Sequence, residues 1–190
     1  MPVKTPLNQH IQAVPKDRKH FLGKISDGEM ILSETGCIAE TFLAEVSIHF
    51  SNAMVAEHVV MQNHIHLILV LNNKRKFAAD DHGNVTGQGI RVGVGPCHGM
   101  ALPATNDIPV GPRHGEAPQT NLFGQPVAGS VSVIINQYKA AVKRWCNKNG
   151  HAGFQWQSRF HDHIIRNDES FKNIVTYIRN NPKQWKEDKF

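Results

Sequence analysis

Residues 57–71 constrain the fold more than any other part of this sequence. They form two strand-like runs, 57–61 and 64–71, with the polar pair Gln62-Asn63 between them. The runs are rich in Val, Ile and Leu, side chains that suit a pleated and partly buried strand. A two-residue polar connection between such runs is typical of a hairpin. The sequence therefore predicts a pair of antiparallel strands here.

Helical and extended segments alternate around this pair. Apolar residues recur at helical spacing over 33–50, 130–149 and 168–180. Extended or hairpin segments are predicted over 9–14, 21–32 and 154–165. The first of these, which Pro15 follows, is expected to be a short edge strand. The order of elements predicts an α+β fold in which helices pack on an antiparallel sheet.

Residues 72–129 have a different composition. They are rich in Gly and Pro and contain a near-repeat, VGPCHG at 94–99 and VGPRHG at 110–115, without helical or strand periodicity. We expect a flexible insertion within a single domain that spans residues 1–190. His98 and His114 of the repeat are interpreted as parts of a linker and not as metal ligands.

Composition narrows the class of protein. The chain has 190 residues, 40% of them apolar, which is enough for a core. It contains no apolar run of membrane-spanning length and no apolar signal region at the N-terminus. Its three cysteines are far apart, so no disulfide framework and no CxxC zinc site is predicted. These features favour a cytoplasmic protein without a membrane partner.

The positive charge is concentrated near the C-terminus. Residues 139–190 contain 11 Lys and Arg against 5 Asp and Glu, a net of +6, whereas residues 1–71 have 5 against 7, a net of −2. Such asymmetry suits a polyanionic partner, because neutralising phosphates drives nucleic-acid binding. A solvated charged surface explains the same counts equally well.

His64-Ile65-His66 is the first candidate for chemistry. On a strand, residues two apart project to one face at a separation of about 6.6–6.8 Å along the backbone. Two imidazoles in this arrangement can bind one divalent ion, while Ile65 packs on the other side. The alternative is a pair of surface histidines on a half-exposed strand.

The second candidate is the last predicted helix. Its residues Asn173, Tyr177 and Asn181 are spaced four apart and form a polar stripe beside an apolar face. Tyr177 and Tyr138 are the two tyrosines of the chain, and Tyr138 lies within the apolar stripe of its own helix. Tyr177 is therefore the better candidate for a reactive phenol, the alternative being a tyrosine at the edge of the core.

Aromatic and cationic side chains are interleaved near both candidates. Stacking on aromatic rings together with positive charge is what unpaired bases and their phosphates require. The residues proposed to bind DNA on this ground are Trp156, Arg159, Arg166, Arg179 and Lys183.

Two segments resemble a known family. VVMQNHIHLILVL at 59–71 resembles the HUH motif of single-strand DNA nucleases, in which two histidines flank a hydrophobic residue on a central strand. FQWQSRFHDHIIRNDESFKNIVTYIRNNP at 154–182 is similar to the C-terminal signature of the REP-associated tyrosine transposases, relatives of the single-strand insertion-sequence transposases. The resemblance extends more loosely to 20–50 and 130–150.

This resemblance implies a ferredoxin-like sheet that bears both histidines, and a tyrosine nucleophile on a C-terminal helix. Carried over by position, it makes His64 and His66 ligands of Mg²⁺ or Mn²⁺, with Asn181 completing the metal site. Tyr177 becomes the nucleophile that forms a 5′-phosphotyrosine intermediate. Gln62 stands where family members usually have proline, which affects the turn and not the ligands.

The resemblance also implies partners and a location. The expected substrate is single-stranded DNA with hairpin elements, acted on in the nucleoid by a transposase-type endonuclease. The insertion-sequence relatives work as dimers and the REP-associated branch as monomers, so a homodimer stays open. Two further classes stay open as well: a non-catalytic nucleic-acid-binding module, and a metal-binding protein suggested by 12 histidines.

Overall fold

The computed structural model describes residues 6–72 and 127–185. Most of the predicted insertion, including His98 and His114, lies outside these residues. The elements in chain order are β1 Leu7–Ala13, the short 3-10 helix η1 Lys16–Arg18, β2 Gly23–Ser26, β3 Glu29–Leu32, α1 Glu34–Ala44, α2 Val46–His49, β4 Ala53–Val60, β5 Ile65–Leu71, α3 Val131–Lys148, β6 His161–Ile165 and α4 Asp168–Asn180.

The main sheet has four strands in the order β4-β5-β1-β6, and all three pairings are antiparallel. Together with α1 and α3 these strands follow the succession β-α-β-β-α-β of the ferredoxin-like fold. β2 and β3 form a separate small hairpin. The predicted α+β architecture and the antiparallel pair at 57–71 are confirmed.

β1 is an interior strand, which corrects the prediction of an edge strand. It pairs with β5 on one side and with β6 on the other. Its polar residues His10 and Gln12 gave it the appearance of a strand at a solvated edge. Both project from the sheet face opposite Ile11, which is fully buried in the main core.

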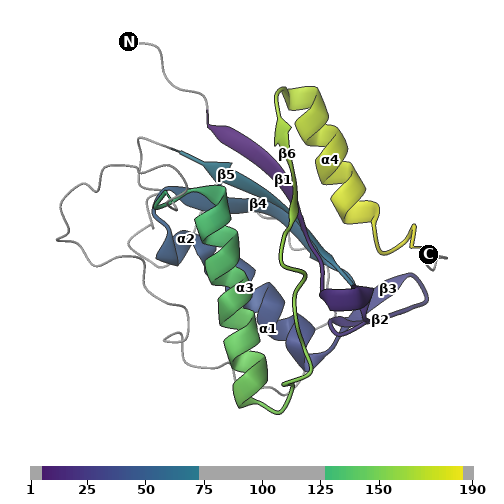
Figure 1. Ribbon diagram of the computed structural model, residues 1–190. Coiled ribbons are helices and arrows are strands. Elements are labelled where there is room, and N and C mark those ends of the chain that lie inside the picture. The colour runs from purple at the N-terminus through teal and green to yellow at the C-terminus, as the bar shows by residue number, and fades with distance from the viewer. Residues whose placement is uncertain (1–5, 73–126, 186–190) are drawn as a thin grey trace, which may run out of the picture.

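The two faces of the sheet are covered differently. α1, α2 and α3 cover one face and α4 covers the other (Figure 1). On β5 the side chains alternate between these sides: Ile65 and Leu67 enter the main core, whereas Ile68 joins a smaller apolar cluster with Ile178 of α4. This alternation follows from the two-residue period of a strand.

The predicted helix over 33–50 is divided in two. α1 begins after Ser33, whose hydroxyl accepts a hydrogen bond from the Gly36 amide at 3.1 Å, and it ends at Ala44. α2 then begins at Val46. Apolar spacing did not reveal this break because Val46 and Phe50 continue the same buried stripe.

The ends of the long insertion meet at one residue, Asn52. The Asn72 amide donates to the Asn52 carbonyl at 2.8 Å, and the Asn52 side-chain amide donates to the Gly129 carbonyl at 3.0 Å. The chain thus leaves the described part of the fold after β5 and returns to it before α3 at nearly the same place.

Of the three cysteines, Cys97 lies outside the described residues. Cys146 on α3 is a free thiol buried in the main core. Cys37 on α1 is also buried.

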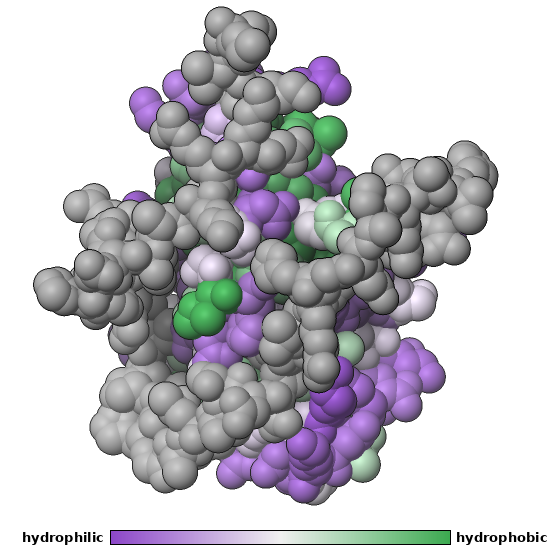
Figure 2. Space-filling model, turned by 90° about the vertical axis from the view of Figure 1, so that its left-hand side faces the viewer, coloured by the Kyte–Doolittle hydropathy of each residue, from purple (hydrophilic) through white to green (hydrophobic). Residues whose placement is uncertain are grey.

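The described surface is mixed in polarity. The exposed large apolar side chains, among them Ile31 and Ile48, lie on separate elements. On the face shown in Figure 2, hydrophilic side chains lie beside small apolar areas where the described residues are visible. Within residues 6–72 and 127–185, no helix has the length and apolar character needed to cross a membrane.

α4 is attached to the sheet by apolar packing and by one ion pair. Phe171, Ile174 and Val175 pack on the smaller cluster. At the end of the helix the Arg179 guanidinium donates to the Glu57 carboxylate, with N–O distances of 2.7 and 2.8 Å. The Glu57 side chain is only 4% exposed, so the pair compensates for burying its charge.

Replacing Arg179 with alanine should therefore destabilise the protein. We expect Arg179→Ala to lower the free energy of unfolding by about 2 kcal/mol, because the Glu57 carboxylate is left buried without its partner. This value lies below that of a fully buried pair, since the Arg179 side chain is 37% exposed. Urea unfolding measures the change. Arg166→Ala, at an exposed position, is the control and should stay within about 0.5 kcal/mol of the wild type.

Candidate functional site

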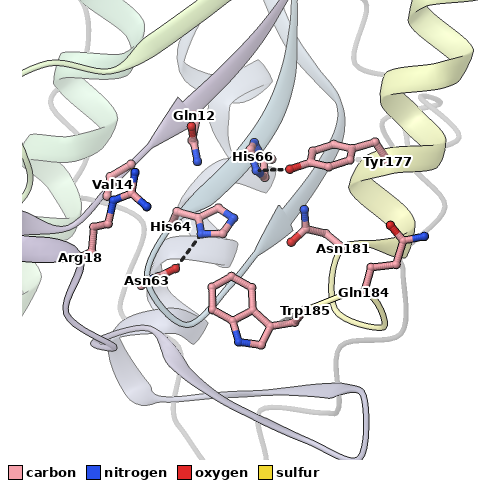
Figure 3. A pocket seen from close by; sticks show the side chains of 10 residues that line it. All are labelled: Gln12, Val14, Arg18, Asn63, His64, His66, Tyr177, Asn181, Gln184 and Trp185. Atoms are coloured by element: carbon pink, nitrogen blue, oxygen red, sulfur yellow. Dashed lines mark hydrogen bonds between the residues drawn. The ribbon is translucent and has the colours of Figure 1, made fainter. Parts of the chain in front are cut away.

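A cavity of about 350 Å³ opens where the end of β1, the turn before β5 and the end of α4 meet. Polar side chains dominate its walls (Figure 3). The residues that line it are Gln12, Val14, Arg18, Asn63, His64, His66, Tyr177, Asn181, Gln184 and Trp185.

The two histidines of the sequence motif lie side by side in this cavity. His64 directly precedes β5 and His66 is its second residue, and their ring centroids are 4.7 Å apart. Ile65, between them, points to the opposite face and is fully buried in the main core. The exposed fractions of His64 and His66 are 8% and 4%, which excludes the alternative of two surface histidines.

Tyr177 reaches the same place from α4. Its hydroxyl oxygen lies 3.4 Å from Nε2 of His66, while 47% of the residue is exposed. Tyr138 is 3% exposed and donates its hydroxyl proton to the Ala39 carbonyl. Burial, and secondarily Glu40, raises the pKa of Tyr138 well above its usual value. Tyr177 is therefore the accessible phenol, as the sequence predicted.

Asn181 completes the group predicted from the sequence. It follows α4 as its C-terminal cap, is 8% exposed and lines the cavity one helical turn after Tyr177. In Figure 3 its carboxamide lies between Tyr177 and Trp185 on the side of the histidines. Asn173, at the other end of the predicted polar stripe, does not line the cavity.

His66 is a neutral imidazole at ordinary pH. Burial, together with the neighbouring His64 and His10, lowers the pKa of His66 to about 3. A neutral imidazole keeps a ring lone pair, which metal binding requires. His66 is therefore able to act as a lone-pair donor at neutral pH.

The donor set fits a metal ion held partly by oxygen. The described residues contain no group of three His, Cys, Asp or Glu side chains that could bind a metal by themselves. The cavity offers two imidazoles and the carboxamide of Asn181. An ion bound there would need further oxygen ligands from substrate or water, as Mg²⁺ and Mn²⁺ accept.

Sequence reasoning missed His10 and Asn63. Nε2 of His10 lies 3.1 Å from Nδ1 of His66, and Oδ1 of Asn63 lies 2.7 Å from Nδ1 of His64. Burial, and secondarily His163, lowers the pKa of His10. The signal that could have indicated His10 was the alternation Asn8, His10, Gln12, which places three polar side chains on one face of β1.

None of the five predicted DNA-binding residues lines the cavity. Trp156 packs edge-on against Phe154 and donates its ring N–H to the Lys139 carbonyl at 3.1 Å. Arg179 is paired with Glu57. The other three predicted residues have exposed side chains and lie outside the cavity: Arg159, Arg166 and Lys183.

Trp185 lines the cavity, whereas Trp156, the tryptophan predicted from the sequence to bind DNA, does not. Its ring centroid lies 5.7 Å from that of His64. Trp185 follows α4 and comes within reach of β5 because α4 packs on the sheet face that carries Ile68. Periodicity in the sequence does not predict how the helix docks on the sheet.

Two lysines of the basic C-terminal region have structural partners. Nζ of Lys139 donates to the carbonyls of Gln157 and Arg159 at 2.5 and 3.3 Å, and burial lowers the pKa of Lys139. Nζ of Lys143 donates to the carbonyls of Ala152 and Phe154. These contacts hold the connection between α3 and β6, so both ammonium groups are already engaged within the protein.

The low pKa of His66 predicts an acid-sensitive fold. Between about pH 6.5 and pH 3 the unfolded chain binds this proton and the folded protein does not, so stability falls as the pH falls. In chelator, we expect the unfolding free energy of the wild type to drop up to about 1 kcal/mol per pH unit more steeply than that of His66→Asn. Urea unfolding at several pH values measures both slopes. His20→Asn, at an exposed position, should keep the wild-type slope, and parallel slopes for His66→Asn would contradict the assignment.

Comparison with known proteins gives the following matches. No family model matches the chain. An uncharacterised protein of Haemophilus influenzae is 25% identical over 173 residues, which cover 91% of this chain and 78% of that protein. Two solved structures are similar at low sequence identity.

The first is a REP-associated tyrosine transposase bound to a REP hairpin, with 15% identity and a TM-score of 0.49 over 96% of this chain and 70% of that one. The second is a candidate transposase of Deinococcus radiodurans, with 12% identity and a TM-score of 0.47 over 95% and 94% of the two chains.

Proposed function

We propose that this protein is a metal-dependent endonuclease and strand transferase for single-stranded DNA, of the transposase type, with Tyr177 as its nucleophile. One observation supports this most directly: an accessible phenol oxygen lies 3.4 Å from a buried, neutral imidazole in a polar cavity. The same cavity contains the second histidine of the motif and Asn181.

His64, His66 and Asn181 are the residues that would hold the metal ion, Mg²⁺ or Mn²⁺. The ion would offset the negative charge that develops on the scissile phosphate. The protein's part is to hold two imidazoles and one carboxamide on rigid elements. His64 and His66 are fixed by the start of β5, and Asn181 by the end of α4.

Tyr177 would attack the phosphorus, breaking the bond to the 3′-oxygen. The products are a 5′-phosphotyrosine on the protein and a strand with a free 3′-hydroxyl, which takes up a proton. The phenol proton can leave to solvent, because Tyr177 is half exposed at the cavity mouth. The phosphodiester energy is kept in the new bond, so a 3′-hydroxyl can reverse the reaction on another strand without a nucleotide cofactor.

The strand would be held by stacking at this cavity and by charge elsewhere on the molecule. Arg159, Arg166 and Lys183 are exposed and available for phosphates, and Arg166 follows β6 at the opposite end of the sheet from the cavity. Trp185 at the cavity can stack on a base, whereas Trp156 is committed to the core. We extend the proposal to hairpin-containing single strands as the substrate and to the nucleoid as the location. A homodimer is one assembly in which the enzyme could work.

Loss of the Tyr177 hydroxyl should abolish the covalent product. We expect Tyr177→Phe to form no adduct with a fluorescent single-stranded oligonucleotide in Mn²⁺, because the attacking oxygen is absent. Oligonucleotide affinity should stay within about twofold, since the ring remains. A denaturing protein gel and a binding titration measure the two properties. Tyr138→Phe is the matched control and should still form the adduct.

An adduct that persists in Tyr177→Phe and disappears in Tyr138→Phe would overturn the assignment of the nucleophile. Binding by the wild type without any adduct would instead indicate the non-catalytic nucleic-acid-binding module.

Removal of either cavity histidine should remove cleavage and metal dependence together. His64→Ala and His66→Ala should each lower the cleavage rate by more than the roughly 10–100-fold typical of losing an outer partner of a metal ligand. Oligonucleotide cleavage with added Mn²⁺ and with chelator measures this. Undiminished cleavage by the wild type in chelator would reject the role of the metal.

A further inference from the structure

We propose that His10 and Asn63 are positioning residues that fix the tautomers of the two cavity histidines, so that Nε2 of both His64 and His66 presents its lone pair to the cavity. The inference rests on the proposed function in one respect: the metal ion that these lone pairs would bind is part of that proposed function. The tautomers themselves can be measured without metal or DNA.

Asn63 determines the tautomer of His64. Oδ1 of Asn63 lies 2.7 Å from Nδ1 of His64, and both residues are buried. A carboxamide oxygen can only accept, so the proton of the His64 ring must be on Nδ1. The lone pair is then on Nε2, the nitrogen that Figure 3 shows turned away from Asn63.

His10 has the corresponding place beside His66. Nε2 of His10 lies 3.1 Å from Nδ1 of His66, with the two rings stacked at a centroid distance of 5.0 Å and an angle of 27°. The opposite nitrogen of His66, Nε2, lies 3.4 Å from the Tyr177 hydroxyl, which can donate to it. One consistent set of hydrogen bonds follows. The Tyr177 hydroxyl donates to Nε2 of His66, and Nδ1–H of His66 donates to Nε2 of His10.

The reverse chain is chemically less suitable. It would put a proton on Nε2 of His66, in a cavity where the ring of His64 lies only 4.7 Å away and carries its own lone pair on Nε2. One imidazole would then present a donor and the other an acceptor. Two equivalent outer acceptors, one on each Nδ1, give the symmetrical arrangement that lets both rings bind one ion.

The position of His10 on β1 determines that its side chain lies beside His66. His10 lies on β1 with its side chain on the α4 face, diagonal to His66 across the β1–β5 pairing. Its cross-strand neighbour on β6, His163, shares this face but is exposed. His163 therefore provides a matched control: a histidine of the same face and sheet, next to His10.

Outer partners of this kind orient the ligand ring and raise its basicity, and their loss typically weakens metal affinity by about 10–100-fold. Glutamine can replace the role of His10, because its side-chain oxygen reaches the position of the imidazole Nε2 as an acceptor. Aspartate can replace Asn63 in the same way. Alanine removes the acceptor in both cases.

The first experiment observes the tautomers directly. Nitrogen-15 NMR of the histidine rings in the full chain, in chelator, should show Nδ1–H for both His64 and His66. His10→Ala should shift His66 toward Nε2–H, and Asn63→Ala should do the same to His64. His10→Gln and Asn63→Asp should keep the wild-type tautomers, and His163→Ala should change neither ring.

The second experiment measures Mn²⁺ affinity by calorimetry, with amide spectra to show that each variant is folded. We expect about 10–100-fold weaker binding for His10→Ala and Asn63→Ala, near-wild-type binding for His10→Gln, and no change for His163→Ala. A wild-type His66 with its proton on Nε2, or a folded His10→Ala with unchanged Mn²⁺ affinity, would overturn the inference. Wild-type protein with the expected tautomers but without Mn²⁺ binding would overturn the proposed function and leave the tautomer assignment standing.

Discussion

The side-chain alternation at the start of β5 is the constraint on which the site depends. Ile65 is sealed in the main core, so its neighbours His64 and His66 must face the opposite side of the sheet. A slip of one residue would exchange these roles, burying an imidazole among apolar groups and exposing Ile65. The same apolar packing that stabilises the sheet therefore also orients the two rings.

The second half of the site comes from one helix. α4 presents both Tyr177 and Asn181, so the way it docks determines where the phenol and the carboxamide lie relative to the histidines. Apolar packing around Ile178 fixes its depth, and the ion pair between Arg179 and Glu57 fixes its end. The charge of Arg179 suggested a contact with DNA. In the structure, Arg179 instead holds α4 in place through its ion pair with Glu57.

The sequence predicted the features that periodicity and local chemistry encode. The bounds of α3 and α4, the antiparallel pair, the histidine pair, Tyr177 and Asn181 all lie where it placed them. The sequence could not predict which side chains from different elements contact one another. Whether Trp156 or Trp185 borders the cavity, and whether Lys139 contacts solvent or a carbonyl, depends on how elements cross in space. β1 was misplaced at the edge for this reason, and His10 was overlooked with it.

The attachment of residues 72 and 129 to Asn52 has a consequence for how such a chain can change over time. The histidines lie at the beginning of β5 and this junction at its far end, roughly 20 Å apart for a strand of this length. Once two chain ends are held together, each doubling of the segment between them costs only about 0.6 kcal/mol in closure entropy. The segment attached at this junction can therefore change in length and composition, or be replaced by a whole domain. The site at the opposite end of the sheet is not affected by such changes.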